Sequence, residues 1–366
     1  MMKPLRACLV GTGHIARVNH LPGLRAHAAR VELVAVHDID SARARAFARE
    51  NDIPATYSEI GEMLAHERPD LVHICTPPAL HAALAIQCLE AGAHVYCEKP
   101  LCASLAELDL INAAEQRTGR VCAVVSQTRY GSSVQHVQAL LSGGVAGRPL
   151  VAVCHTLWYR PPSYYEVPWR GKWSNELGGA TVGQGIHAMD RLLFLLGEWS
   201  SIRAVVRTLD RRIEVEDLSA AIIEFRNGCI ATVVNSVLSP REESYLRIDL
   251  QQATVELRHL YDFNNDNWRF TAAPGASAEI GAQLQALPKD VPANHAAQIG
   301  VLLDDLEHGT AHLTAGDEAR RTLELLTALY KSAFTDSVVY RGTIRKEDPF
   351  YRSFHGGRET IPPGPV

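Results

Sequence analysis

Two glycines and an alanine, Gly11, Gly13 and Ala16, stand between an apolar run that ends at Val10 and a helix-like stretch. Gly11 allows a tight turn, Gly13 lets the backbone approach a pyrophosphate, and the small Ala16 permits close packing of helix on strand. The amino end of that helix attracts the charge of a phosphate. The motif predicts a dinucleotide-binding loop, and an ordinary strand-helix turn is the alternative.

Asp38 ends the second apolar run, 22 residues after Ala16. A carboxylate at that distance accepts hydrogen bonds from the ribose of an adenosine. It repels a 2′-phosphate, and Ile39 and Asp40 follow it rather than Arg or Ser, so NAD is favoured over NADP. The alternative role for Asp38 is that of a helix N-cap.

Glu98-Lys99-Pro100 follows the apolar segment 93–97, which we expect to be a strand that ends at the ligand-binding edge of a parallel sheet. A lysine there lies beside the nicotinamide end of a bound dinucleotide. Desolvation can lower the pKa of a lysine so that it acts as an acid or a base near neutral pH. The alternative is a solvated surface pair before a helix.

Two further positions are candidates for a site. Thr76-Pro77-Pro78 forces a turn after another apolar run, with His81 at the start of the next helix, and this turn either contacts the cofactor or only ends a strand. His187 follows a glycine-rich segment before an apolar helix and can point into a crevice or pack in the core. Asp190, one turn later, is expected to be structural.

Segment 160–173 is dense in aromatic and basic side chains. Tryptophan faces stack on the C–H faces of sugar rings, and arginine or lysine binds hydroxyls, carboxylates or phosphates. The segment therefore predicts part of a substrate pocket, and a well-packed interface loop is the alternative. The candidates are Arg160, Tyr165, Trp169, Arg170 and Trp173, with Arg129 and Tyr130 as weaker ones.

The elements that must position these residues alternate between strand and helix in the first part of the chain. That rhythm predicts a parallel sheet with helices on both faces. We expect strands at 5–10, 31–37, 71–75, 93–97 and 121–127, and helices at 15–30, 41–51, 80–91 and 105–118.

After about residue 145, long strand-like runs dominate, and Asn227-Gly228 between two of them indicates a hairpin. We expect an α+β domain on an open sheet whose uncovered face is covered by a second subunit, in a homodimer or homotetramer. The expected strands are 150–159, 202–209, 218–225, 230–237, 245–250 and 254–257, and the helices 179–196, 295–307 and 317–334.

The expected fold class is therefore α/β, with a doubly wound parallel Rossmann sheet followed by an α+β domain on a large, mainly antiparallel open sheet. The length of 366 residues predicts two domains. We place a dinucleotide-binding domain at 1–128 and a substrate-binding and oligomerisation domain at 129–347. Residues 348–366 form a tail that we expect to be poorly ordered or draped over a neighbour.

Composition narrows the class of protein. With 46% hydrophobic and 21% charged residues, the chain can bury a large core, which excludes wholesale disorder. A net charge of -5 argues against nucleic acid as the main partner. No apolar run reaches the roughly 18 residues that span a bilayer, so we expect no membrane association. Residues 1–6 lack the apolar core of a signal peptide, and we expect a cytoplasmic protein.

The cysteines and histidines show no metal pattern. None of the eight cysteines forms a Cys-x-x-Cys, and most lie in apolar stretches, which predicts buried, reduced thiols in a reducing compartment. The sixteen histidines are scattered without His-x-x-x-His or a Cys/His cluster. We therefore expect no bound metal.

Taken together, these motifs resemble the Gfo/Idh/MocA oxidoreductase family, which includes glucose-fructose oxidoreductase and inositol dehydrogenase. The likeness covers nearly the whole chain in order and spacing. It is carried by Gly11-x-Gly13-x-x-Ala16, Asp38, Thr76-Pro77-Pro78-x-x-His81, Ala91-Gly92-x-His94-Val95-x-x-Glu98-Lys99-Pro100-Leu101, Gly178-Gly179-Ala180, Gln184-Gly185-Ile186-His187-Ala188-Met189-Asp190 and Glu216-Asp217.

The resemblance implies that Lys99 and His187 are catalytic and flank the substrate, and that the Lys99-Pro100 bond is cis. The cofactor-binding residues we expect are Gly11, Thr12, Gly13, His14, Ile15, Asp38, Thr76, Pro77, His81, Glu98, Lys99 and Gln127. The substrate-binding residues we expect are Lys99, Arg129, Tyr130, Arg160, Tyr165, Trp169, Arg170, Trp173, Gln184 and His187. The pattern around segment 160–173 looks like the branch of the family that acts on sugar derivatives.

One position departs from the family. An Asp, or in some branches an Asn, commonly stands four residues before the catalytic His, where this chain has Gly183. Such an Asp orients the imidazole and stabilises its charged form. Here Gln184, water or a substrate group has to take that place.

The expected function is an NAD-dependent dehydrogenase that transfers hydride between a secondary hydroxyl of a sugar, glycoside or cyclitol and the nicotinamide. Gly183 keeps open a second enzyme class, which retains NAD and uses transient oxidation to cleave a glycoside without net redox change. A third alternative is a regulatory protein that binds NAD without catalysis, against which Lys99 and His187 both speak.

Overall fold

The computed structural model describes residues 3–358, 360 and 361, which form two compact units. Unit 1 comprises Met1–Val125 and His295–Arg320, and unit 2 comprises Ser126–Asn294 and Arg321–Val366. The sequence places a single boundary at 128 and assigns all of 129–347 to the second domain. The structure corrects that division, because the segment from His295 returns to unit 1.

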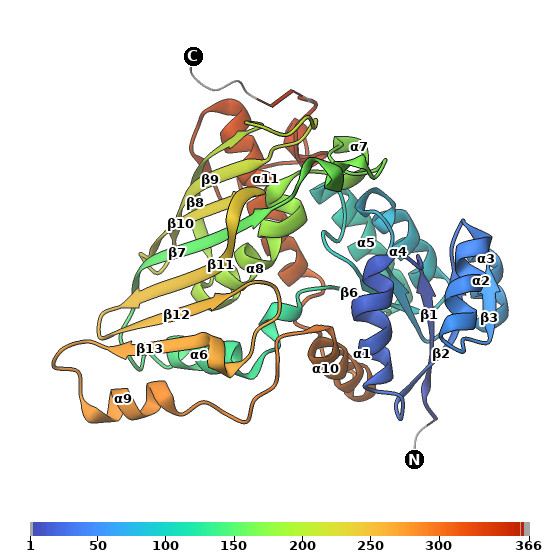
Figure 1. Cartoon of the computed structure of the whole chain (residues 1–366), viewed down its shortest axis with the longest axis horizontal. Helices are drawn as coiled ribbons and strands as arrows, with labels where there is room; N and C mark the ends of the chain where they lie inside the picture. The colour runs from blue at the N-terminus through green and yellow to red at the C-terminus, as the bar shows by residue number, and fades with distance from the viewer. Residues whose placement is uncertain (1–2, 359, 362–366) are drawn as a thin grey trace. The chain divides into compact units, whose positions relative to one another are not determined.

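Unit 1 is built on a six-stranded sheet in the order β3-β2-β1-β4-β5-β6, with every neighbouring pair parallel (Figure 1). The chain runs outward from β1 in both directions, so the carboxyl ends of β1 and β4 meet where the strand order reverses. Open sheets of this kind bind ligands at that point. The predicted doubly wound parallel sheet is confirmed.

The elements of unit 1 follow the predicted order closely. Segment 55–67, for which the sequence predicts no element, adds a short edge strand and a helix. The strands are β1 (Leu5–Val10), β2 (Val31–His37), β3 (Ala55–Tyr57), β4 (Leu71–Ile74), β5 (His94–Cys97) and β6 (Cys122–Val124). The helices are η1 (Ala16–His20), α1 (Leu21–Arg25), α2 (Ser41–Glu50), α3 (Ile60–Glu67), η2 (Pro78–Leu80), α4 (His81–Glu90), α5 (Leu105–Thr118) and α10 (His295–His308).

Helix α10 belongs to unit 1 for a packing reason. Its apolar residues Ile299, Leu302 and Leu303 are fully buried in a cluster with Leu24 of α1 and Tyr96 of β5. This face of the helix therefore completes the core beneath the parallel sheet. The sequence alone predicts the helix but gives no sign of which sheet it covers.

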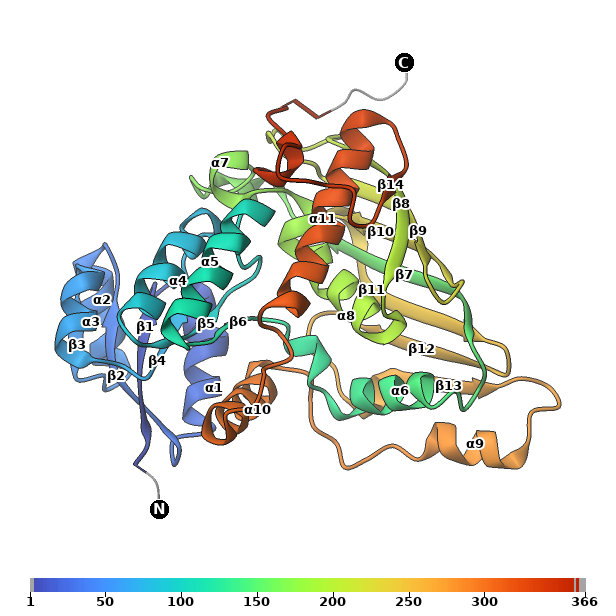
Figure 2. The ribbon, with the colours of Figure 1, turned by 180° about the vertical axis from the view of Figure 1, so that it is seen from behind.

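Unit 2 is built on an eight-stranded sheet in the order β13-β12-β11-β7-β10-β9-β8-β14. All neighbouring strands are antiparallel except β7 and β10, which run parallel. Gly228 has a φ of 87° in the connection between β9 and β10, where the hairpin is predicted. Helices α6, α8 and α11 lie on one face of this sheet (Figure 2).

The elements of unit 2 include several for which the sequence predicts nothing, among them α6, α9 and β13. The strands are β7 (Pro149–Tyr159), β8 (Trp199–Arg207), β9 (Leu218–Phe225), β10 (Ile230–Ser236), β11 (Leu238–Leu250), β12 (Ala253–His259), β13 (Trp268–Ala272) and β14 (Val339–Tyr340). The helices are η3 (Gln127–Arg129), α6 (Ser132–Ser142), η4 (Pro162–Glu166), α7 (Trp173–Glu176), η5 (Thr181–Gly185), α8 (Ile186–Leu196), η6 (Asn265–Asn267), α9 (Ala278–Gln285), α11 (Asp317–Thr335, mostly in unit 2) and η7 (Pro349–Tyr351).

The segment that follows residue 347 is not the loose tail that the sequence predicts. Phe350, Tyr351 and Phe354 are buried. The ring of Phe354 lies 5.7 Å from that of Tyr330 in α11, so apolar side chains hold this segment against unit 2. Residues 1, 2, 359 and 362–366, on which the expectations about the two termini also fall, lie outside the described residues.

Two further observations concern the cysteines and the apolarity of the helices. All eight cysteines are free and buried, as the sequence predicts. None of the helices within residues 3–358, 360 and 361 has both the length and the apolarity of a membrane span.

Candidate active site

The loop after β1 has the shape that a dinucleotide needs. Gly11 has a φ of 89°, and a Cβ added there would lie 2.8 Å from the backbone oxygen of Cys75, so only glycine fits. A Cβ on Gly13 would meet nothing within 4 Å, which leaves open space beside the backbone at the start of the helix. The residues of this loop therefore fit a pyrophosphate, as the sequence predicts.

Asp38 lies at the end of β2 beside this loop. Its Oδ2 accepts hydrogen bonds from the backbone nitrogen of Thr12 at 2.9 Å and from Thr12 Oγ1 at 2.8 Å. Asp40, not Asp38, caps helix α2, because its Oδ1 accepts from the nitrogens of Ala42 and Arg43. The N-cap alternative for Asp38 is therefore wrong. Its carboxylate is instead hydrogen-bonded to Thr12 of the glycine loop.

Arg43 is a neighbour of Asp38 for which the sequence gives no signal. Its Nε and one terminal nitrogen donate to the two carboxylate oxygens of Asp38 at 3.0 Å and 2.7 Å. Burial opposes ionisation of Asp38, but the hydrogen bonds from Arg43 and Thr12 outweigh it and lower the pKa of Asp38 to about 2. Asp38 is thus an oriented carboxylate at neutral pH.

Thr76, at the carboxyl end of β4, carries a buried hydroxyl oxygen that lacks a hydrogen-bond partner among the described residues. Buried hydroxyls in proteins are paired in the great majority of cases. The side chain also lies next to Gly11, because its Cγ2 would be 3.2 Å from a Cβ there. An unpaired hydroxyl beside the glycine turn fits the cofactor role that the sequence leaves open, in the segment that continues through Pro77.

Glu98, at the end of β5, is bound within the protein and not turned toward a ligand. Its Oε1 accepts from His20 Nε2 at 3.1 Å and from His295 Nε2 at 3.2 Å, and its Oε2 accepts from the backbone nitrogen of Lys99 at 3.1 Å. Burial opposes ionisation, but the bonds from both histidines hold the pKa of Glu98 well below its ordinary value. The carboxylate therefore helps to position Lys99, and the expected contact of Glu98 with the cofactor stays a prediction.

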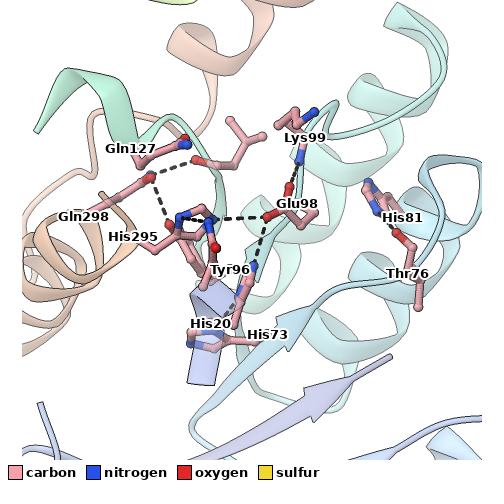
Figure 3. A network of polar contacts seen from close by, with 12 residues as sticks. His20, His73, Thr76, His81, Tyr96, Glu98, Lys99, Gln127, His295 and Gln298 are labelled. Carbon is pink, nitrogen blue, oxygen red and sulfur yellow. Dashed lines mark hydrogen bonds and ion pairs between the residues drawn. The ribbon is translucent and has the colours of Figure 1, made fainter. Parts of the chain in front are cut away.

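The network around Glu98 extends into the core of unit 1 (Figure 3). His20 Nδ1 lies 3.0 Å from His73 Nδ1, and His295 Nδ1 lies 3.0 Å from the side-chain nitrogen of Asn19. Burial lowers the pKa of both His20 and His73. The rings of His20 and His73 are therefore neutral at physiological pH, and His20 donates to the ionised carboxylate of Glu98.

His20, Glu98 and His295 are also residue types that bind metals, and their ligand atoms lie within 4.8 Å of one another. The scattered positions of these residues in the sequence hide this cluster. In the structure the same atoms satisfy each other at hydrogen-bond distances. The expected absence of a metal stays a prediction.

His81 has a structural task that replaces its expected role at the cofactor. It is fully buried, with Nδ1 2.7 Å from the backbone oxygen of Pro100 and Nε2 2.9 Å from that of Thr76. Both ring nitrogens are occupied, so the ring fastens the turn after β4 to the backbone beside Lys99. The Lys99-Pro100 bond is cis, as the resemblance implies.

Lys99 itself is half-buried at the carboxyl end of β5. Figure 3 shows its side chain extending away from the histidine cluster to which Glu98 turns. The sequence Glu98-Lys99 therefore places an anchored acid on one side and a lysine on the ligand edge on the other.

In unit 2, the segment before α8 is held by Glu216. Glu216 Oε1 accepts from the backbone nitrogens of Gly179 and Thr181 and from the hydroxyl of Tyr330. A Cβ on Gly179 would lie 1.7 Å from the backbone oxygen of Glu216, so the close approach requires glycine. The glycines before His187 therefore serve packing, and they set the position at which α8 begins.

A small pocket in unit 2 is lined by His187. The ring of His187 meets that of Tyr261 edge-on, with 5.8 Å between the ring centres. The lining residues are Gln127, Thr128, Thr156, Trp158, Gln184, His187, Ala188, Arg191, Ser244, His259, Leu260 and Tyr261. Three of them, Gln127, Gln184 and His187, are among the predicted site residues, whereas Trp158, Arg191, His259 and Tyr261 are not.

Arg129 is not available to a substrate. Its Nε and a terminal nitrogen donate to the two carboxylate oxygens of Asp190 at 2.8 Å and 2.6 Å, and both side chains are buried. Thr322 of α11 adds a third bond to Asp190 at 2.7 Å. Arg129 therefore forms a structural ion pair in place of the substrate contact that we expected. The next residue, Tyr130, is buried and does not line the pocket.

The aromatic and basic segment 160–173 stacks largely on itself. Arg170 lies over the rings of Tyr164 and Trp169, at 3.8 Å and 4.5 Å from their centres. Trp173 is buried among aromatic side chains of α11 and the segment that follows it, and its expected contact with substrate stays a prediction. None of Arg160, Tyr165, Trp169, Arg170 and Trp173 is among the residues that line the pocket of the described chain.

Gly183, where the family commonly has an acid, lies in the widened turn of η5. A Cβ there would lie 3.9 Å from Glu176 Oε1. Glu176 is buried, and its Oε2 accepts from the backbone nitrogen of Gly171 at 2.6 Å. A carboxylate from another part of unit 2 thus stands next to the position of the missing one.

Comparison with known proteins agrees with this geometry. Residues 5–126 match the model of an oxidoreductase family with an NAD-binding Rossmann fold, and residues 134–256 match the GFO/IDH/MocA C-terminal domain. The chain is 27% identical over 361 residues to D-glucoside 3-dehydrogenase of Escherichia coli strain K12, covering 92% of this chain and 97% of that one. It is 27% identical over 379 residues to D-apiose dehydrogenase of Paraburkholderia graminis, covering 97% and 95%.

A solved structure extends the likeness to three dimensions. The WlbA dehydrogenase of Bordetella pertussis, in complex with NADH and UDP-GlcNAcA, superimposes with a TM-score of 0.82 at 28% identity, covering 92% of this chain and 99% of that one. Since both parts of the chain match the same family and the glycine loop, Asp38 and Thr76 fit its cofactor, this protein is an NAD-binding oxidoreductase of the Gfo/Idh/MocA family.

Proposed function

We propose that the protein is an NAD-dependent dehydrogenase that oxidises a secondary hydroxyl of a sugar, glycoside or cyclitol, or reduces the matching ketone. The observation that carries this proposal is a lysine anchored at the ligand edge of a Rossmann sheet that belongs to an oxidoreductase family. The relatives named D-glucoside 3-dehydrogenase and D-apiose dehydrogenase, and a neighbour crystallised with NADH and UDP-GlcNAcA, support a sugar as substrate.

The residues that would hold the cofactor are the loop Gly11–Ile15, Asp38 and the turn at Thr76-Pro77, and NAD would supply the hydride acceptor. Lys99 Nζ takes the proton of the substrate hydroxyl while the C–H bond of the carbon that bears this hydroxyl breaks. His187 donates a hydrogen bond to the same oxygen and stabilises its developing negative charge. Gln184 and the ring of Trp158, which line the pocket with His187, bind the rest of the sugar.

Substitution of Lys99 tests the assignment. Lys99→Ala should lower kcat by at least about 100-fold, because the proton acceptor is lost, while the affinity for NAD stays nearly unchanged. The exposed Lys289→Ala is the matched control and should keep full turnover. The substrate is first found by thermal shift with NAD over monosaccharides, glycosides and inositols, since a ligand that fits stabilises the fold. Near-normal turnover of Lys99→Ala would refute the role of Lys99.

A redox-neutral glycoside-cleaving activity is a second candidate, because Gly183 removes the acid that commonly partners the catalytic histidine. NADH that accumulates in step with sugar oxidation excludes this candidate. Cleavage of a glycoside without net NADH supports it.

We further propose a homo-oligomer that forms through the sheet of unit 2. Ile222 and Ile230 are 53% and 49% exposed, and the strand register places both on the same face as the exposed Val151 and Val205. Exposed apolar residues on one sheet face favour burial against a second copy. The free, buried cysteines support a reducing compartment such as the cytoplasm.

A further inference from the structure

Arg191 is a buried cation with no ion-pair or hydrogen-bond partner within the part of the chain that the structure describes. It lies four residues after His187 in α8, so the two side chains share one face of the helix, and both line the pocket. Arg191 is 1% exposed, and none of its three guanidinium nitrogens has a hydrogen-bond partner among the described residues. A guanidinium carries five N–H donors, and burying it unpaired is costly.

The neighbours of Arg191 do not replace a counter-ion. The acid next to it in sequence, Asp190, accepts its hydrogen bonds from two nitrogens of Arg129 and from Thr322, and none from Arg191 is recorded. The ring of Phe263 lies 5.1 Å from the guanidinium carbon, a weak cation–π contact in place of an ion pair. Burial lowers the pKa of Arg191 to about 10, so the group still carries its charge at neutral pH.

Three more polar atoms on the pocket wall lack partners among the described residues, and two of them are acceptors that need a hydrogen-bond donor from a ligand. These atoms are Gln127 Oε1, Thr156 Oγ1 and His259 Nε2. His259 Nδ1 lies 3.1 Å from the backbone oxygen of Tyr261 and must donate to it, which leaves Nε2 of the neutral ring as an acceptor. Gln127 Oε1 is also an acceptor, so both atoms fit the hydroxyl groups of a ligand.

We propose that this pocket binds a sugar that bears an oxyanion, either a carboxylate or a phosphate, and that Arg191 holds the oxyanion. A planar guanidinium matches the oxygens of both groups with paired hydrogen bonds. Gln127 Oε1 and His259 Nε2 accept from sugar hydroxyls, and Trp158 packs on the C–H face of the ring. This inference rests on the proposed sugar dehydrogenase function and names the class of its substrate.

Equilibrium binding to the full-length protein, with NADH in place of NAD so that no sugar is oxidised, tests the inference. The probes are D-glucuronate, methyl D-glucuronoside and D-glucose 6-phosphate, each against its neutral counterpart D-glucose or methyl D-glucoside, with thermal shift and tryptophan fluorescence as readouts. We expect at least one anionic sugar to bind about 10-fold or more tightly than its neutral counterpart. The two kinds of anionic probe identify whether a carboxylate or a phosphate is the oxyanion.

Substitution locates the effect. Arg191→Met should abolish the preference for the anionic sugar, and Arg191→Lys, which keeps the charge but not the fork, should retain part of it. Arg203→Met, an exposed arginine of the same unit, is the matched control and should bind like the wild type. Without ligand, Arg191→Met should melt no lower than the wild type, because a buried unpaired charge is removed.

Three results would overturn the inference: equal binding of anionic and neutral sugars, a preference that survives in Arg191→Met, or equally tight binding of inorganic phosphate alone. Because binding is measured without turnover, the result for Arg191 can be judged independently of the activity test of the proposed function. Loss of activity in Lys99→Ala with the anion preference intact supports both. Turnover of neutral sugars with no role for Arg191 overturns only this inference.

Discussion

The carboxyl edge of β5 in unit 1 and the pocket of unit 2 both contain buried charged and polar side chains, but they differ in how those side chains are paired. Glu98 accepts three hydrogen bonds from the protein, and His81 uses both ring nitrogens on backbone oxygens. In the pocket, Arg191 and His259 present nitrogens that lack partners within the described part of the chain.

The difference in pairing distinguishes side chains that position their neighbours from side chains that bind a ligand. Residue type alone does not make this distinction. A buried group satisfied by the protein holds its neighbours in one geometry whether or not a ligand is present. A buried group left unsatisfied gains its partner only when a ligand arrives, so part of the cost of folding is returned as binding energy. Glu98 and His81 are therefore positioning residues, whereas Arg191 is a binding residue.

The largest expected effect on stability comes from Glu98. Glu98→Ala leaves the donors of His20, His295 and the Lys99 backbone unpaired, and we expect the free energy of unfolding to fall by at least about 3 kcal/mol. The half-exposed Glu90→Ala, which loses only a surface pair with Arg117, should change it by about 0.5 kcal/mol or less. Urea denaturation measures both. A loss below about 1 kcal/mol for Glu98→Ala would show that the network is not a paired scaffold.

The pH dependence of stability gives the next effect. Burial, and then the charge of Arg191, lower the pKa of His259 to about 2, against 6.5 for a free histidine. Below pH 6.5, His259 takes up a proton in the unfolded chain but stays neutral in the folded chain. It therefore lowers the free energy of unfolding by about 2 kcal/mol at pH 5. Asp38 adds nothing in this range, because its stabilisation is lost only as the pH falls from 3.8 through about 2.

His259→Gln should therefore lose less stability than the wild type between pH 7.5 and pH 5, by about 2 kcal/mol. Urea denaturation at both pH values checks this. Parallel losses in the two proteins would mean that His259 titrates as it does in water, and that the pocket wall is not desolvated.

The smallest effect comes from two buried threonines. Thr322 donates to Asp190 at 2.7 Å, whereas Thr156 Oγ1 has no partner among the described residues. Thr322→Val should cost about 1.5 kcal/mol, and Thr156→Val should be neutral within about 0.5 kcal/mol, because no bond within the protein is lost. Thermal unfolding ranks the pair. Equal costs would show that Thr156 is satisfied in solution without a ligand.

Much of the molecule follows from the sequence by itself. Strand and helix alternation predicts the parallel sheet, since apolar periodicity and glycine turns are local signals. The glycine loop and Asp38 can be predicted for the same reason, because each stands at a fixed place relative to a strand end, whereas the roles of Lys99 and His187 follow from the resemblance to the family. The prediction of a loose segment after residue 347 fails because burial against distant aromatic side chains leaves no local signal in the sequence.

Only the tertiary structure decides which of these residues are satisfied. His295 reaches Glu98 from 197 positions away, and Arg129 meets Asp190 from 61 positions away. No spacing rule predicts such pairs, because they depend on where whole elements pack. The same packing buries Arg191 with no partner among the described residues. In the sequence this residue cannot be told from the other arginines, because burial depends on which elements pack around it.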